Sequence, residues 1–361
     1  MSTHEHDPRA ALPPVAPNRK APTGAVRGTS LPYLAVVEVQ GPDAGSFLQG
    51  QLTQDALSMS PGRARAGGYC SAKGRLLANF VMLHPDSDTW WLLTHAGLVE
   101  PLVKRLKMFV LRARCTVRAR PDLLVSGELA GARSLWEVEL MPSSDTAVPG
   151  AIDGSAAALA DGDRVQQPDT AWAVGWWGGR TLWLSRVSGP APSPLASVAL
   201  AQPTQSPADS PAQEAWRHAD IAAGWPWIEP ATVDQFVPQM VNFELLDGVN
   251  FRKGCYPGQE VVARSQYRGT LKRRMALFSV QAPAGPLPAA SSELFHSEDP
   301  GQPAGMVVNA STDPQDRRRI HLLAEVKLAA TVSGSLHLGS PEGPALQPQP
   351  LPYAIPADTE R

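Results

Sequence analysis

Cysteine, charge of one sign and long hydrophobic runs are all scarce in this 361-residue sequence. The three cysteines, Cys70, Cys115 and Cys255, include no Cys-x-x-Cys pair, which argues against a disulfide framework and against a closed zinc site. A reducing compartment fits this pattern best. Charged residues make up 18% of the chain and the net charge is −2, so no global field attracts the protein to nucleic acid or to a membrane. Any anion-binding site must therefore be local.

Segments apolar enough to span a membrane or to act as a signal peptide are also missing. Residues 92–110 are interrupted by charged residues such as Glu100 and Lys104, and they fall short of the roughly 20 apolar residues that cross a bilayer. Residues 1–32 lack the apolar run of a signal peptide and are expected to form a disordered leader. We therefore expect a soluble, cytoplasmic protein that does not bind membranes.

Proline is the residue in excess, because 36 prolines among 361 residues are roughly twice the usual share. The prolines crowd into stretches that can be neither helix nor central strand. Residues 141–170 and 189–211 are predicted to be exposed connections, and residues 336–361 a Pro-rich tail. The sequence contains no internal repeat and no Gly-rich phosphate loop.

The first half of the chain alternates strand-like and helix-like segments. The expected elements are a strand at 34–40, a helix beginning at Ala44, a β-hairpin over 67–83, a strand at 89–94 and an amphipathic helix over 97–113. Strands with single covering helices favour the α+β class.

The second half of the chain has a related pattern. Two short strands are expected within 172–186, a helix over 212–223 with Trp216 on its apolar side, and another element over 233–246. Short β-like runs after residue 275 are separated by Pro/Gly turns, a pattern that suits a small C-terminal barrel.

The most informative stretch is residues 252–274, which hold seven basic residues and one acid, Glu260. Gly254 and Gly258 allow the backbone to approach a ligand closely, and Pro257-Gly258 marks a tight turn into a helical or extended run at 259–263. The stretch therefore has the form of a cationic, ligand-binding loop.

Cys255 follows Lys253 closely, so nearby positive charge favours its thiolate form and raises its reactivity or metal affinity. The alternative is a small buried side chain with no chemistry. Glu260 is similarly open, since it either neutralises Arg264 one helical turn later or accepts hydrogen bonds from a heterocycle.

These residues resemble a known family. Lys253–Glu260 reads K-G-C-Y-P-G-Q-E and matches the K-G-C-Y-x-G-Q-E signature of YgfZ-type proteins at every fixed position. We call residues 253–260 the signature loop. The flanks at 236–251 and 262–269 resemble the same family, as do residues 47–55 and 72–75 near the N-terminus and the Pro-Leu-Pro-Tyr ending at 350–353.

The resemblance implies the fold of the glycine-cleavage T protein, with two α/β units and a C-terminal β-barrel around a central folate pocket. The corresponding boundaries are a leader at 1–32, an N-terminal unit at 33–140, a second unit at 171–275, a barrel at 276–335 and a tail at 336–361. It also implies binding of tetrahydrofolate or a derivative, and a role in assembly or repair of Fe–S enzymes, including radical-SAM enzymes that modify tRNA.

The resemblance and the loop composition together predict site residues. Cys255 is the candidate reactive thiol, and no metal site is predicted. The predicted cofactor-binding residues are Trp216, Lys253, Gly254, Tyr256, Gly258, Gln259, Glu260, Arg264, Asn242, Gln51 and Asp55. They offer the aromatic surface, polar pair and cations that a flat pterin with an anionic tail requires.

Several of these residues also have an interpretation that is purely structural. Trp216 falls where the family has a tryptophan close to the folate, but large aromatics mostly serve packing. The family's other folate-side tryptophan is replaced here by Tyr33 or Leu34. Residues 49–55 could form a solvated polar helix face, and the charges of Lys73 and Arg75 could serve solubility alone.

Three functions follow as hypotheses. The first is a folate-dependent support factor for Fe–S enzymes, with Cys255 as a transient sulfur or metal ligand, because three scattered cysteines cannot supply an ordinary four-thiolate cluster. The second is an aminomethyltransferase or other one-carbon transferase, with Asp55 or Glu260 as the acid. The third is a tRNA-binding module that uses the basic stretch, with Tyr256 and Tyr267 stacking on bases.

Overall fold

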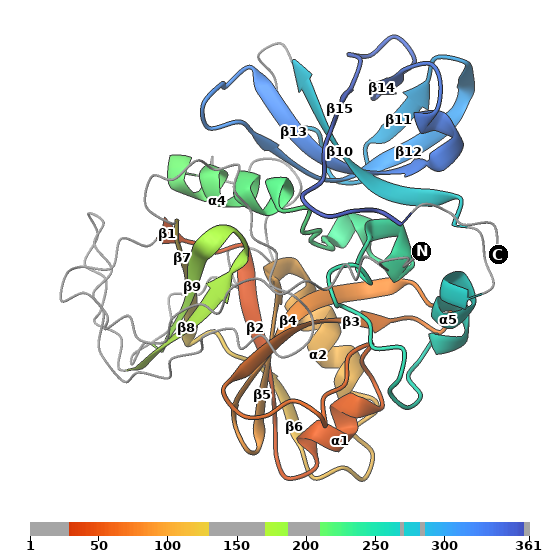
Figure 1. Cartoon of the computed structure of the whole chain (residues 1–361). Coiled ribbons are helices and arrows are strands. Elements are labelled where there is room, and N and C mark those ends of the chain that lie inside the picture. Colours follow the sequence, from red (N-terminus) through yellow and green to blue (C-terminus); the bar gives the residue numbers. More distant parts are fainter. Residues whose placement is uncertain (1–28, 130–169, 187–209, 268–270, 282–285, 357–361) are drawn as a thin grey trace, which may run out of the picture.

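The computed structural model describes residues 29–129, 170–186, 210–267, 271–281 and 286–356. These residues form three antiparallel sheets and a few short helices, which confirms the α+β class (Figure 1). Residues 1–28 of the predicted leader and nearly all of the two predicted proline-rich connections lie outside the described residues. Among the described helices, none has the length and apolar character needed to cross a bilayer.

The first sheet is antiparallel, and its three central strands are buried along most of their length. Its strands, in spatial order, are β3 (Arg63–Cys70), β4 (Leu76–Asp86), β5 (Thr89–His95), β2 (Leu34–Gln40) and β6 (Thr116–Ala119). The predicted strand at 34–40, the hairpin and the strand at 89–94 are all present. Helix α1 (Ala44–Gln49) and helix α2 (Val99–Lys107) contact this sheet.

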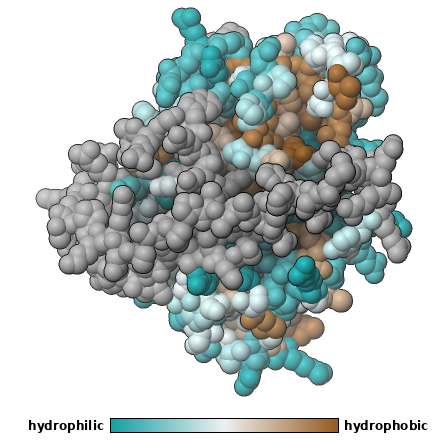
Figure 2. Space-filling model, viewed as in Figure 1, coloured by the Kyte–Doolittle hydropathy of each residue, from teal (hydrophilic) through white to brown (hydrophobic). Residues whose placement is uncertain are grey.

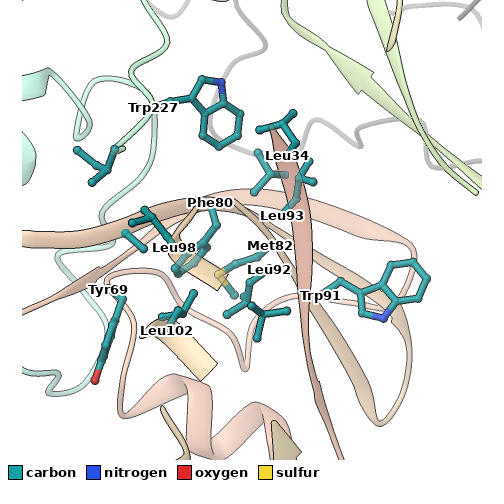
Figure 3. Close-up of a cluster of buried hydrophobic side chains, with 14 of the residues drawn as sticks. Leu34, Tyr69, Phe80, Met82, Trp91, Leu92, Leu93, Leu98, Leu102 and Trp227 are labelled. Carbon is teal, nitrogen blue, oxygen red and sulfur yellow. The ribbon is translucent and has the colours of Figure 1, made fainter. Parts of the chain in front are cut away.

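The core between the first sheet and α2 is built from one face of each strand (Figure 3). Leu92 on β5 and Met82 on β4 meet Leu102 of α2, and all three are buried. Trp91, one residue before Leu92, points to the opposite face because strand side chains alternate. There its ring meets Trp172 edge-on at 4.6 Å between ring centroids. The first sheet is therefore covered on both faces.

Helix α2 is shorter than the predicted helix over 97–113. The backbone N–H groups of Met108 and Phe109 donate to the carbonyls of Arg105 and Leu106, three residues back, which tightens the last turn and ends the helix. Phe109, which helical spacing over 97–113 places with the apolar residues, is 43% exposed. The hydrophobic periodicity of the sequence continues to residue 113, but the helix ends at Lys107, where it no longer covers the first sheet.

The second sheet combines strands from both halves of the chain. Its order is β1 (Thr29–Ser30), β7 (Leu123–Glu128), β9 (Arg180–Arg186) and β8 (Thr170–Trp176). The two predicted strands within 172–186 are β8 and β9, and β9 pairs with β7, which lies far earlier in the sequence. The predicted N-terminal and second units therefore share a sheet.

The C-terminal sheet curls into a half-barrel. Its order is β14 (Leu336–Leu338), β11 (Glu293–His296), β12 (Asp299–Thr312), β13 (Arg319–Lys327), β10 (Arg273–Gln281) and β15 (Gln347–Gln349). Strands β14 and β15 lie within residues 336–361, the segment predicted to be a tail. In Figure 2, apolar residues gather over this sheet with hydrophilic residues around them.

Helix α4 (Pro211–Ala222) lies between the C-terminal sheet and β1 of the second sheet (Figure 1). Ser210 begins it with a capping box, in which its hydroxyl accepts from the Gln213 N–H and the Gln213 side chain accepts from the Ser210 N–H. Its buried face includes Trp216 and His218. Burial lowers the pKa of His218 to about 4 and also lowers the pKa of His321 on β13, so both imidazoles are neutral at pH 7.

The segment 233–246, predicted to form one element, consists of turns and the short 3-10 helix η4 (Pro238–Val241). Asp234, Asn242 and Asp247 all have positive φ angles, between 56° and 61°. A residue in the left-handed region cannot continue a right-handed helix, so the apolar residues here are buried in a series of turns.

Candidate functional site

Three segments that are distant in the sequence meet at the signature loop. Lys253 is the centre of this contact, because its Nζ donates to the carbonyl oxygens of Gln49 (2.5 Å) and Leu52 (2.6 Å). The Gln49 carbonyl ends α1 and the Leu52 carbonyl lies three residues later, where orphan carbonyl groups and the negative end of the helix favour a cation. Lys253 therefore ties the signature loop to the N-terminal motif.

Lys253 is 8% exposed, and its ammonium lies 5.1 Å from the centre of the Tyr256 ring. Burial lowers the pKa of Lys253 to about 8, against the opposing effects of Asp55 and Cys255. The group is mostly protonated at pH 7, in the form that can donate to both carbonyls.

Further hydrogen bonds hold the approach to the signature loop. The Thr53 hydroxyl donates to the Gly248 carbonyl at 2.6 Å and accepts from the Gly68 N–H at 2.8 Å. The Asn250 N–H donates to the Thr53 carbonyl at 2.9 Å, and the Asn250 side chain accepts from the Lys253 N–H at 3.1 Å. Residues 49–55 are thus fixed against the second half of the chain rather than lying on a solvated helix face.

The turn at residues 71–75 packs against the other end of the signature loop. Gly258 has a φ of 78°, and a Cβ there would lie 2.3 Å from the Ser71 carbonyl oxygen. Gly74 also has a positive φ of 70°, and a Cβ there would lie 2.8 Å from Val261. Arg75 donates to the Gln235 carbonyl at 2.5 Å. The two glycines allow backbone contacts that a side chain would prevent.

Between the contacts at Lys253 and at Gly258, part of the signature loop faces solvent. Gly254 and Cys255 are exposed, and a Cβ on Gly254 would have no heavy atom within 4 Å. Cys70, by contrast, is buried, and burial raises the pKa of its thiol to about 12. Of the three cysteines, Cys255 is the exposed one, and Cys115 is half-buried.

Helix α5 (Gln259–Tyr267) continues from the signature loop, beside the end of β3 (Figure 1). Gln259 is half-buried, and Glu260 and Arg264 are exposed. Gln51 and Asp55 are half-buried in the segment that Lys253 anchors. The Oε1 atom of Gln51 is buried and, within the described part of the chain, has no hydrogen-bond partner.

The basic residues of 252–274 do not form one free cationic surface. Arg273 pairs with Glu325 at 2.8 Å, and Arg274 pairs with Glu244 at 2.8 Å. Lys253 is buried, and Arg268 lies outside the described residues. Those left exposed are Arg252, Arg264 and Lys272.

Two predicted site residues have structural surroundings. Trp216 is 0% exposed; the Arg180 guanidinium lies 4.5 Å from its ring centre, and a Cβ on Gly127 would lie 2.4 Å from the ring. Asn242 is also 0% exposed; its side chain donates to the Met275 carbonyl at 2.8 Å and accepts from Arg274 at 3.1 Å. The structure therefore does not bring either side chain to the exposed face of the signature loop.

Asp247 is a residue that the sequence reasoning missed. It is half-buried, its backbone carbonyl accepts from the Gln54 amide at 2.6 Å, and burial raises the pKa of its carboxyl to about 6 despite the nearby Arg65. Its place in an Asp-Gly pair five residues before the basic stretch marked it only as a turn residue. A carboxyl with such a pKa can exchange a proton near neutral pH.

Curated proteins of known name resemble the chain over most of its length. No protein-family model matches the chain. The chain is 30% identical over 333 residues to the tRNA-modifying protein YgfZ of Sodalis glossinidius, covering 90% of this chain and 92% of that one. It is 29% identical over 350 residues to that of Pectobacterium carotovorum, covering 96% of each.

A solved structure shares the fold. The crystal structure of the glycine cleavage system aminomethyltransferase T from Bartonella henselae matches with a TM-score of 0.62 at 17% identity, over 91% of this chain and 87% of that one. This likeness confirms the predicted T-protein-like architecture.

Proposed function

The chain belongs to the YgfZ family, and from this premise we propose that it binds tetrahydrofolate or a derivative and supports the assembly or repair of Fe–S enzymes, including enzymes that modify tRNA. The curated relatives are named as tRNA-modifying proteins, and the fold is that of an aminomethyltransferase. Radical-SAM tRNA modifiers in the cytoplasm are the proposed clients.

The observation that carries this proposal is the convergence of residues 49–55, residues 71–75 and the signature loop. Lys253 and Gly258 join these segments so that Cys255 stands exposed between two anchored turns. A loop anchored at both ends holds its exposed atoms in a fixed geometry, which a site requires and which a mere surface turn does not.

The residues at this position fit a folate. Gln51 offers a buried oxygen that no described residue satisfies, and such an oxygen accepts well from the amino group of a pterin. Gln259 and Glu260 add further polar groups, and the exposed Arg264 can pair with the glutamate tail. Gly254 leaves open space beside the backbone. In this proposal Trp216 and Asn242 support the site from the core.

The proposal is tested by calorimetric titration of tetrahydrofolate into the full chain and its Cys255→Ala and Gln51→Leu variants. We expect equal affinity for Cys255→Ala and weaker binding for Gln51→Leu, because the thiol serves sulfur or metal transfer and the amide holds the ligand. Cys115→Ala is the matched control for the loss of a thiol. Absence of tetrahydrofolate binding by the wild type would overturn the folate assignment.

The Fe–S role needs a separate measurement. In cells that lack their own member of the family, the wild type should restore the activity of an Fe–S tRNA-modifying enzyme, and Cys255→Ala should not. Restoration by both proteins would remove Cys255 from the mechanism while leaving folate binding intact.

Asp247 favours a second candidate function, an aminomethyltransferase or other one-carbon transferase. Its raised pKa of about 6 gives the chain a carboxyl suited to move a proton beside a folate nitrogen. Turnover of tetrahydrofolate with an aminomethyl donor, lost in Asp247→Asn, would establish this function. Binding without turnover would favour the accessory role.

A further inference from the structure

We propose that His218, Asp313 and His321 form a binding site for a divalent transition-metal ion, with Zn²⁺ as its preferred occupant, between α4 and the C-terminal sheet. The site is distinct from the signature loop and does not depend on the proposed folate function. The sequence predicts no metal site, whereas the fold brings together two histidines that are 103 positions apart.

The three side chains present their ligand atoms to one another. One nitrogen or carboxylate oxygen from each residue lies within 4.8 Å of the others, and the His218 Nε2 and His321 Nδ1 atoms are 2.7 Å apart. Among the described residues this is the one group of histidine, cysteine or acidic side chains with such a geometry. Two imidazoles and a carboxylate are a common ligand set for zinc.

The strand register explains why these residues converge. Ser311 pairs with His321, and the Asp313 N–H donates to the Arg319 carbonyl, so Asp313 and His321 share one face of the β12–β13 hairpin. The Ser311 hydroxyl donates to the Glu214 carbonyl of α4 at 3.3 Å, which shows that this face covers the helix. His218 lies one helical turn after Glu214 and therefore on the same side of α4.

The site is buried and held from both sides. His218 is 1% exposed, and Asp313 and His321 are each 3% exposed. At the outer end, Arg317 of the hairpin pairs with Glu214 at 2.5 Å, which fixes the hairpin over the helix.

The surrounding charges also permit a cation. Arg180 and Arg319 are the cations whose fields reach the two histidines. Arg180 is neutralised by Asp220 at 2.8 Å, and Arg319 lies 3.8 Å from Asp316. The carboxylate of Asp313 therefore remains to offset part of the charge of a divalent ion.

The ring positions require only a small adjustment. Two nitrogens bound to one zinc ion at about 2.0–2.1 Å in tetrahedral geometry are roughly 3.3 Å apart, so the rings have to separate by about 0.6 Å. The imidazole planes are inclined at 29° with their centroids 4.8 Å apart. Three protein ligands leave a fourth position for water.

The competing explanation is a hydrogen-bonded chain of Asp313, His321 and His218 that joins α4 to the hairpin without a metal. Such a chain stabilises the fold but has no reason to bind a metal ion. The two explanations therefore differ in a measurable property of the folded protein.

The experiment is a titration of the untagged, chelator-treated full chain with Zn²⁺ in a competition assay, and with Co²⁺ followed by visible absorption. We expect one equivalent of Zn²⁺ and the intense d–d bands of a tetrahedral Co²⁺ site. His321→Gln and Asp313→Asn should weaken Zn²⁺ binding at least about tenfold, the lower end of losses caused even by residues that only support a ligand.

The matched control is His337→Gln, which removes a histidine of the same sheet that lies outside the cluster and bonds Ser335 and Gly343. It should bind Zn²⁺ as the wild type does. Circular dichroism of each variant verifies folding, and the Co²⁺ spectrum of the wild type tests the site even if a variant does not fold. No Zn²⁺ binding by the folded wild type, or equal binding by Asp313→Asn, would overturn the proposal.

Discussion

At the scale of single residues, the two glycines of the signature loop have opposite surroundings. Gly258 has a positive φ and no room for a Cβ, whereas Gly254 faces open space. We expect Gly258→Ala to destabilise the protein by about 1–3 kcal/mol through strain and steric overlap. Gly254→Ala should change the free energy of unfolding by less than about 1 kcal/mol. Urea denaturation of the two variants measures this difference.

The same pair of glycines separates folding from ligand binding. If a folate approaches the backbone at Gly254, Gly254→Ala should weaken tetrahydrofolate binding while leaving stability intact. Unchanged affinity in this variant would mean that the ligand lies elsewhere, whatever the result at Gly258.

Asp247 predicts a pH dependence of stability. Its pKa rises from 3.8 to about 6 on folding, so the folded protein binds more protons than the unfolded chain between these values, and stability falls as pH rises through this window. The penalty is fully present above pH 6, and solvent screening at this half-buried site reduces it to about 1 kcal/mol.

Asp247→Asn should therefore be more stable than the wild type above pH 6 and equal to it below pH 4. Asparagine also suits the positive φ of 56° at this position. Urea denaturation at several pH values is the measurement, with Asp88→Asn, a change at an exposed turn, as the control. A constant difference between variant and wild type across the pH range would contradict this explanation.

At the scale of elements, Lys253 joins the end of α1 to the signature loop. Lys253→Met keeps most of the side-chain volume but leaves the Gln49 and Leu52 carbonyls without the ammonium donor. We expect a loss of about 2 kcal/mol in the free energy of unfolding. Lys73→Met, at the exposed tip of the adjacent turn, should be nearly neutral. Equal effects of the two substitutions would show that the contact contributes no stability.

The sequence predicted local elements well where apolar runs or helical periodicity agree with turn residues, as in β2, β5, β9 and α4. It failed where tertiary contacts decide. The periodicity of 97–113 could not show that α2 ends at Lys107, and 233–246 carried apolar residues without revealing the left-handed residues that break it into turns.

The properties of the candidate site likewise fall into those that the sequence predicted and those that it could not. The motif predicted that Lys253, Gly254 and Cys255 belong together, since they are adjacent in sequence. It could not predict that Lys253 is an anchor, that Trp216 is enclosed, or that Asp247 has a raised pKa. Burial depends on which distant segments cover a residue, and a single sequence does not record this.

At the scale of the whole molecule, Asp220 connects three parts of the fold. Its carboxylate, 1% exposed, accepts from Arg180 of β9 at 2.8 Å, from the Trp176 indole of β8 at 2.9 Å and from the Trp227 indole at 3.0 Å. We expect Asp220→Asn to cost about 3–5 kcal/mol, because it leaves the Arg180 charge buried and unbalanced.

The control for Asp220 is Asp43→Asn. Asp43 pairs with Arg114 at 3.0 Å, but this pair is largely exposed and screened by solvent, so it should contribute little to stability. Thermal unfolding of both variants compares a buried and a surface ion pair in one protein. Similar melting temperatures would contradict a central role for Asp220.

The mixed second sheet has a consequence for how the polypeptide can be divided. Strands β7 and β9 are hydrogen-bonded neighbours, yet one precedes residues 130–169 and the other follows them. If the chain is split within that interval and the two halves are expressed separately, one half carries β7 and the other carries β9, its hydrogen-bonded neighbour. The two halves should reassemble into the folded protein when they are mixed, which makes the chain suitable as a two-part reporter of association.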